Sequence, residues 1–416
     1  MFLEIGIDQI YLMGQVEDFS NRNARRRFHR NLKRRRRELR KLNEEIENIE
    51  LDDAVECNTC SSSLIIKWGR YRRKVRYFLS KAKRILVQRF RCLLCGRTFS
   101  ILPSFLLKFR RFARKAFIDM MDAKLSFGSG NRNTGNWNRA FRVSHTTMLR
   151  EIYTLGRKCR RALREMASYF SGVMCIDDIW IRRRRREWIY ALCAVDARTE
   201  RVLWVDAYLS ESKGDEVVDR LVEELSEIIP PQNLEFFITD DDKTLISARK
   251  KHYPDAKHQY CIFHIKRRIY HRLVPPAKYL KLSQESIQLI DCIMSIFDAS
   301  TKEEAILLLS SLYKKRMDHS TKVRGVLESL WKKREELFLY MEHDIPKTNN
   351  AAEHFFSSVF PIKRVCKSFR SIKGVVNILS AKGLHWNFND RYESKDGKTP
   401  NERSGIVTKM NMYDYV

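Results

Sequence analysis

Apolar and polar positions change their period several times along the chain. Between Gly172 and residue 263, short apolar runs of strand length alternate with charged turns and with two amphipathic helical segments. We expect strands at 172–181, 187–197, 201–210, 234–241 and 256–263, and helices at 213–229 and 244–253. Three strands joined by hairpins, followed by helix, strand, helix and strand, predict an antiparallel meander that continues into a βαβ unit. The segment is therefore expected to form an α/β domain with a mixed sheet.

Helical periodicity dominates on both sides of this segment. A helix is predicted at 113–126, and helices are expected throughout the chain between His264 and Pro346. Another helix is expected to begin after Ser144, because a serine at that position can cap the first turn. Its inward face is expected to carry Met148, Ile152 and Leu155.

The helical segments on either side of the GSGN sequence indicate a helix-turn-helix, although an ordinary helical hairpin has the same pattern. In a helix-turn-helix the second helix enters the major groove of DNA, and the polar residues of its N-terminal end face the base edges. The candidate DNA-binding residues are Ser144, His145, Thr146, Thr147 and Arg150.

The charge balance strengthens the nucleic-acid interpretation. The 416 residues include 80 Lys and Arg against 51 Asp and Glu, a formal net charge of +29, and the most economical partner for such a chain is a polyanion. The Arg-rich stretch 21–50 is expected to be a nucleic-acid-binding arm or, alternatively, a solvated charged helix. Neither a signal peptide nor an apolar run of about 20 residues is visible. We therefore expect a cytoplasmic, nucleoid-associated protein of a prokaryotic host, without a membrane partner.

Two of the cysteine pairs have the spacing of metal ligands. The motifs Cys57-Asn-Thr-Cys60 and Cys92-Leu-Leu-Cys95 flank two strand-like segments, and the second is followed by Gly96. Two such knuckles supply the four thiolates of a tetrahedral structural Zn²⁺ site. The sequence predicts a zinc ribbon, with redox or chance pairing as the alternative.

Three acidic residues stand at the ends of otherwise apolar segments: Asp177, Asp240 and Glu353. A carboxylate in such a place is costly unless a cation balances its charge, and carboxylate oxygens are the ligands that Mg²⁺ prefers. Acidic neighbours compete for the same role, namely Asp178, Asp241, Asp242, Asp196 and Asp206. Strand alternation does not choose between Asp177 and Asp178, because both faces of this strand are apolar.

Four motifs in register give these acids a family context. The chain has IDD at Asp177, FITDD at Asp240, Cys261-Ile-Phe-His264, and NNAAEHFF around Glu353, followed by KTPNERSGI near the end. Together they resemble a mutator-like DDE transposase, related to insertion-sequence transposases. The resemblance covers about residues 170–408 and implies an RNase H-like catalytic domain with an all-helical insertion.

The resemblance also implies a chemistry and a set of roles. Two Mg²⁺ (or Mn²⁺) ions would be bridged by Asp177 and each held with help from Asp240 or Glu353. The residues expected to support this architecture are Cys261, His264, Asn349 and Asn350. The implied activity is cleavage and strand transfer at the terminal inverted repeats of a mobile element, by a homodimer or higher oligomer on double-stranded DNA. The alternatives are an RNase H-like structure-specific nuclease and a non-catalytic DNA-binding protein derived from a transposase.

Composition and motifs divide the chain into seven expected segments. These are a basic helical arm (1–50), a zinc ribbon (51–105), a helix-turn-helix (106–168), the first part of the catalytic domain (169–265), a helical insertion (266–345), the second part of the catalytic domain (346–395) and a C-terminal tail (396–416).

Overall fold

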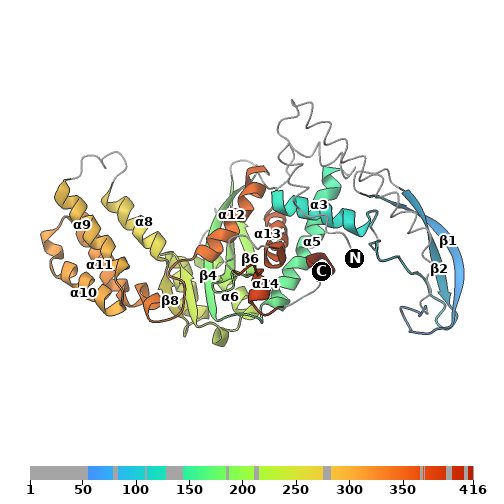
Figure 1. Ribbon diagram of the computed structural model, residues 1–416, viewed down its shortest axis with the longest axis horizontal. Helices are drawn as coiled ribbons and strands as arrows, with labels where there is room; N and C mark the ends of the chain where they lie inside the picture. The colour runs from blue at the N-terminus through green and yellow to red at the C-terminus, as the bar shows by residue number, and fades with distance from the viewer. Residues whose placement is uncertain are drawn as a thin grey trace, which may run out of the picture. The chain divides into compact units, whose positions relative to one another are not determined.

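The computed structural model divides the protein into two compact units, residues 1–148 and 149–416. Figure 1 labels their helices and strands. The arm predicted at 21–50 lies outside the residues that the structure describes. The described residues are 55–77, 83–107, 110–127, 144–183, 187–209, 215–274, 283–365, 369, 371–389, 396–406 and 411–415.

The first unit contains a small antiparallel sheet of order β1-β2-β3. Its long strands β1 (Ile65–Val75) and β2 (Lys83–Cys92) are those expected between the two cysteine knuckles, and β3 (Thr98–Ser100) follows the second knuckle. The helix predicted at 113–126 is α3 (Arg114–Phe127). A small apolar cluster made by Val75, Leu106, Ala113 and Ala116 joins the strands to the start of this helix.

The helix α5 (His145–Met166) begins where the sequence predicts and crosses the boundary between the two units. The backbone N–H of Thr147 donates to Ser144 Oγ at 3.1 Å, so Ser144 caps the helix. Met148, Ile152 and Leu155 are buried, as expected. The turn and any helix between α3 and α5 fall within 128–143, outside the described residues, and the helix-turn-helix remains a prediction.

The second unit is built on a mixed sheet of order β6-β5-β4-β7-β8. The strands β4 (Val173–Arg182), β5 (Trp188–Asp196) and β6 (Val202–Leu209) form the expected antiparallel meander. The strands β7 (Phe236–Thr239) and β8 (Lys257–Tyr260) continue the sheet in parallel with β4. The mixed α/β fold predicted from the alternation of strand and helix patterns is confirmed.

Helices cover both faces of this sheet. On one face, α6 (Asp215–Ile228) and α7 (Lys243–His252) share a large hydrophobic cluster with inward residues of β4, β5 and β6. On the other face lie α12 (Asn350–Val365) and α13 (Ile372–Asn389), which contact β4, β5 and β6 (Figure 1). The Asn387 side chain fixes α13 to the sheet by bonding the backbone N–H and carbonyl of Val202, each at 2.8 Å.

A helical bundle separates the last strand from α12. It consists of α8 (Ile262–Leu273), α9 (Gln284–Ser295), α10 (Lys302–Lys314) and α11 (Thr321–Leu337), connected in part by short 3₁₀ turns. These helices have their own hydrophobic core, so the insertion is a packed subdomain rather than a long loop. The C-terminal segment adds the short helices α14 (Pro400–Arg403) and α15 (Met412–Tyr415). In the described part of the chain, no helix has the length and apolar character needed to cross a bilayer.

Candidate active site

Asp177 lies in the middle of the central strand β4, opposite Cys193 of β5. Its side chain shares a face of the sheet with Cys175, whose thiol lies 4.0 Å from the carbonyl of Thr348, just before α12. Burial raises the pKa of the Asp177 carboxyl to about 8, and the negative charges of neighbouring carboxylates add to this effect. These neighbours are Asp178, Glu353 and Asp240. The α12 face of β4 therefore holds a desolvated carboxyl surrounded by other acids.

Asp178 points to the opposite face of the sheet. Its negative charge contributes to raising the pKa of Tyr190 and of Tyr208, two hydroxyls in the cluster beneath α6 and α7. Because adjacent residues of a strand face opposite sides, Asp177 and Asp178 cannot share one site on the sheet. The packing of α12 thus distinguishes the two aspartates, which the apolar pattern of the strand left equivalent.

Asp240 directly follows β7, the neighbour of β4 in the sheet. Burial raises the pKa of its carboxyl, and the charge of Asp242 acts in the same direction, whereas His264 and Arg268 oppose the shift. In the described part of the chain, Asp240 forms no ion pair with a basic side chain. Its charge therefore remains available to a ligand.

The two acids after Asp240 have structural partners. Asp242 caps α7 by accepting the backbone N–H of Thr244 at 2.8 Å. Asp241 forms ion pairs with Arg268 of α8 and Lys333 of α11, and so ties the end of β7 to the helical insertion. Of the three consecutive acids, Asp240 alone is left without a structural role of this kind.

The two other competing aspartates are also committed to the fold. Asp196 is fully buried and organises the turn after β5, where its carboxylate accepts the backbone N–H and hydroxyl of Ser171 at 2.8 and 2.7 Å. Asp206 of β6 forms an ion pair with Arg160 of α5. Both carboxylates hold segments of the second unit together.

Glu353 lies in the first turn of α12, the helix that covers the Asp177 face. Its Oε1 atom is buried, has no hydrogen-bond partner, and lies 3.7 Å from the Nε2 atom of His264. The buried Ala352 and Phe355 flank Glu353 and anchor this turn of the helix. The glutamate is thus held rigidly, with an acceptor oxygen that the protein does not satisfy.

The Cys261, His264 and Asn349 side chains connect the start of α8 to the start of α12. The Cys261 thiol donates to Asn349 Oδ1 at 3.1 Å and lies 3.3 Å from His264 Nδ1. The Asn349 side chain is fully buried, and its Nδ2 atom has no hydrogen-bond partner. These side chains form a network between the two helix starts, in which only His264 lies near the Glu353 carboxylate, and Asn350 is exposed.

The three sequence-predicted acids influence one another electrostatically, and carboxylates are the donors that a hard divalent cation prefers. Asp177 is repelled by both Asp240 and Glu353, so the three carboxylates share one electrostatic environment. Among the described residues they do not form a tight cluster around a single point, as the four cysteines do. Repulsion among three like charges keeps the carboxylates apart. A centre with two ions would also need its ligands at two positions rather than one.

The four cysteines of the first unit do form such a cluster. All four Sγ atoms of Cys57, Cys60, Cys92 and Cys95 lie within 4.8 Å of one another. The Cys57–Cys95 and Cys60–Cys92 separations are 3.6 Å, close to the edge of about 3.8 Å expected for a tetrahedron with Zn–S bonds of about 2.3 Å.

Backbone N–H groups in the knuckles favour the thiolate form of two of these cysteines, whereas the pKa of the Cys60 thiol is raised. The backbone N–H of Cys60 lowers the pKa of Cys57, and that of Cys95 lowers the pKa of Cys92. Gly96, in the second knuckle, has φ +69°, the left-handed conformation expected for a glycine that relieves the turn. The predicted convergence of the two motifs is confirmed, and the cluster could bind zinc.

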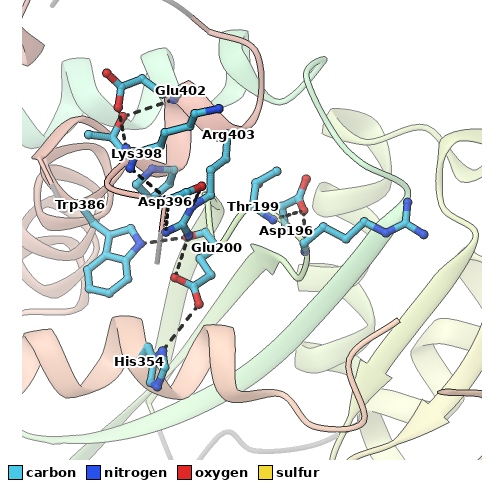
Figure 2. A network of polar contacts seen from close by, with 12 residues as sticks. Asp196, Thr199, Glu200, His354, Trp386, Asp396, Lys398, Glu402 and Arg403 are labelled. Carbon is cyan, nitrogen blue, oxygen red and sulfur yellow. Dashed lines mark hydrogen bonds and ion pairs between the residues drawn. The ribbon is translucent and has the colours of Figure 1, made fainter. Parts of the chain in front are cut away.

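Sequence reasoning missed one polar centre beside the candidate site. Figure 2 shows Glu200, in the turn between β5 and β6, among residues of three other elements. Its carboxylate lies 3.1 Å from Arg403 and 3.7 Å from His354, the residue after Glu353. Its carbonyl accepts the indole N–H of Trp386 at 2.9 Å. Glu200 thus links α12, α13 and the C-terminal segment.

The C-terminal KTPNERSGI motif explains how Arg403 reaches this centre. Thr399 and Glu402 form a capping box around α14, and Arg403 also pairs with Asp396 at 3.3 Å. Glu200 has φ +59°, a conformation that costs free energy for a residue with a side chain. The contacts of the Glu200 side chain with Arg403 and His354 offset that cost. Through Arg403, the KTPNERSGI motif holds the C-terminal segment against the sheet.

This arrangement predicts an energetic coupling between Glu200 and Arg403. We expect Glu200→Gln and Arg403→Gln each to lower the thermal midpoint, with a coupling energy of about 0.5–1 kcal/mol in the double-mutant cycle, because the pair is only partly exposed. Additive effects of the two substitutions would contradict the proposed link.

Comparison with known proteins bears on two parts of the chain. Residues 173–268, which contain Asp177 and Asp240, match the MULE transposase domain. Residues 57–137, which contain the cysteine cluster, match a domain of unknown function, DUF6431. The chain is also 21% identical over 359 residues to the "Insertion element ISM1 uncharacterized 48.3 kDa protein" of Methanobrevibacter smithii, covering 79% of this chain and 82% of that protein.

The MULE match and the insertion-element relative support a transposase of the mutator-like type. Such a protein has DNA as its partner and cuts or transfers DNA strands.

Proposed function

We propose that the protein is a DDE transposase that binds the terminal inverted repeats of a mobile element and catalyses strand cleavage and strand transfer. The observation that carries the proposal is the position of Asp177 on the α12 face of β4, beside β7 and the segment that begins α12, where the charges of Asp240 and Glu353 act on it. The strand order 3-2-1-4-5 of this sheet, counted along the chain, is consistent with the RNase H-like fold. Asp177 and Asp240 lie within the matched transposase domain.

The three carboxylates have complementary positions for holding Mg²⁺ or Mn²⁺. Asp177, on which the charges of both other acids act, would hold the ions together with Asp240 and Glu353. Bound divalent ions would supply Lewis-acid stabilisation of the attacking and leaving oxygens in an in-line displacement. His264 stands between Asp240 and Glu353, lowers the pKa of the first and lies 3.7 Å from the second. It therefore helps to position both carboxylates.

The N-terminal unit is proposed to recognise the element ends. A zinc ion held by the four cysteines would fix the two knuckles, and the capped end of α5 would present its polar residues to base edges. Ser144, Thr146 and Arg150 are exposed there and are accessible to DNA, whereas Thr147 is half-buried. Because a transposase must hold two ends together, we expect at least a dimer on DNA.

In vitro strand transfer tests this function. The full-length protein, incubated with Mg²⁺ and a duplex carrying the element's terminal repeat, is expected to join the repeat end to a target duplex. A structure-specific nuclease would produce nicked or cut DNA without joined products. Binding to the repeat without cleavage in Mg²⁺ or Mn²⁺ would instead identify a non-catalytic DNA-binding protein.

A further inference from the structure

The two long strands of the first unit carry an uncompensated positive charge. Together β1 and β2 contain nine Lys and Arg residues and no Asp or Glu. The side chains of a strand alternate between its faces, and directly paired residues of neighbouring strands share a face. The pairing register therefore determines where each of these cations lies.

One face of the β1–β2 ribbon gathers four of the cations. Lys74 pairs with Arg84, Arg72 with Leu86, and Arg70 with Gln88, so all six residues lie on the same side of the ribbon. We call the set Arg70, Arg72, Lys74 and Arg84 the cationic face. All four of its members are exposed.

The opposite face of the ribbon is already occupied. Val75 and Ile85 belong to the apolar cluster formed with Leu106 and Ala113, from the segment that leads into α3. The Arg73 guanidinium lies on this side and donates to the carbonyl of Leu107 at 2.5 Å. The cationic face is therefore the exposed side of the ribbon, opposite the apolar cluster.

The cationic face is electrostatically unfavourable in the protein alone. Like charges that stand directly opposite each other destabilise a strand pair, and Lys74 faces Arg84 in this way. Within the described ranges, none of the four residues pairs with a carboxylate, and Arg70 donates instead to the neutral Gln88 side chain at 3.0 Å. An arrangement that costs stability, with no carboxylate partner among the described residues, points to an external anion.

The shape of the ribbon indicates which anion. The major groove of B-DNA admits a two-stranded β-ribbon, and alternate residues of a strand lie about 6.7 Å apart, about twice the axial rise of 3.4 Å per nucleotide. Leu86, opposite Arg72, is 62% exposed between the cations and offers an apolar contact of the kind that thymine methyl groups accept. A row of cations at this spacing, with an apolar residue among them, is complementary to a duplex groove.

We propose that the cationic face of the β1–β2 ribbon docks on double-stranded DNA through its phosphates, with the ribbon lying along the major groove. The inference rests on the proposed function, because it names a DNA contact of that same protein. It adds a second DNA-binding surface to the capped end of α5. A zinc ion held by the four cysteines would close the opposite end of the ribbon, where Ile65 pairs with Cys92.

The test is a charge-neutralised ribbon in the full-length protein: Arg72→Gln, Lys74→Gln and Arg84→Gln combined. Fluorescence anisotropy with a terminal-repeat duplex should show DNA binding weakened by roughly tenfold to a hundredfold near 0.15 M salt. The slope of −log Kd against log[salt] should become smaller in magnitude by about 2.7, which is about 0.9 for each lost phosphate contact. The zinc content should be unchanged. The thermal midpoint should not fall, because the variant relieves repulsion between cations.

A matched control removes the same charge elsewhere. Lys314→Gln, Lys315→Gln and Lys322→Gln neutralise three exposed lysines of the helical insertion. The proposal is overturned if the ribbon variant binds DNA normally, if both triple variants weaken binding equally, or if only RNA binding is lost. If the wild-type protein fails to transfer strands but the ribbon variant still loses DNA affinity, the transposase function fails and the ribbon surface stands.

Discussion

Replacing Asp177 with asparagine is expected to reduce strand transfer roughly a thousandfold or more, the scale of losing a group that stabilises transition-state charge. The same substitution should stabilise the metal-free protein. An aspartate carboxyl ordinarily has a pKa of 3.8, whereas the pKa of Asp177 in the folded chain is about 8, so the folded state binds an extra proton between these values. The stability of the wild-type protein therefore falls as the pH rises through this window, and the asparagine variant escapes this loss.

Activity and thermal unfolding measured together test this expectation. Between about pH 5 and pH 8 the melting temperature of the variant should increasingly exceed that of the wild-type protein, by about 2–4 °C for each kcal/mol of relieved repulsion. Added Mg²⁺ should narrow the difference, because an ion that binds only the folded wild-type site stabilises that state.

Asp178→Asn is the matched control, since it changes the same chemical group one residue away on the other face of β4. We expect it to keep strand transfer within about tenfold of wild type, because Asp178 lies near Tyr190 and Tyr208 rather than Glu353. If Asp178→Asn abolishes activity and Asp177→Asn does not, the assignment is wrong by one residue. If both variants remain fully active, the carboxylate site itself is wrong.

The strands and helices of the second unit were predictable because apolar residues repeat with different periods in the two kinds of element. The segment expected at 172–181 is β4, Val173–Arg182, and the other four strands and two helices of the second unit also fall where expected, within a few residues at their ends. The cysteine cluster was predictable for a different reason. A CxxC motif fixes two ligands locally, so only the antiparallel pairing of two strands was needed to bring the pairs together.

The residue pattern alone did not choose among the neighbouring acids, and the prediction of Asp177 and Asp240 rested on the family resemblance. The contacts that distinguish these acids involve partners distant in sequence. Asp177 differs from Asp178 only through the packing of α12, a helix about 175 residues further on. Asp241 is distinguished from Asp240 by Lys333, which lies on the helical insertion. The Glu200 centre was missed for the same reason, since Arg403 is 203 residues away and no local spacing connects the two. Each of these assignments required the tertiary structure.

Removing zinc is expected to unfold the ribbon while the catalytic unit remains folded. Among the described residues, the apolar cluster that joins the ribbon to α3 has four buried members, Val75, Leu106, Ala113 and Ala116, so a metal that ties both knuckles together would add much to the stability of the ribbon. Protein purified without chelator should contain about one zinc ion per chain. A strong chelator should remove this zinc, abolish hydrogen-exchange protection in β1 and β2, and weaken DNA binding through loss of the cationic face.

The catalytic unit should stay folded when the loss of zinc unfolds the ribbon. Its mixed sheet and the clusters beneath α6 and around the helical insertion do not involve the cysteine cluster, so protection in β4 and β5 should persist after chelation. Cys57→Ser should reproduce the effect of the chelator, whereas Cys292→Ser, at an exposed cysteine of α9, should not. Protein that contains no zinc, or a ribbon that keeps full protection in Cys57→Ser, would mean that the four thiols do not form a structural metal site. Because zinc binds thiolates, its retention should also weaken as the pH falls.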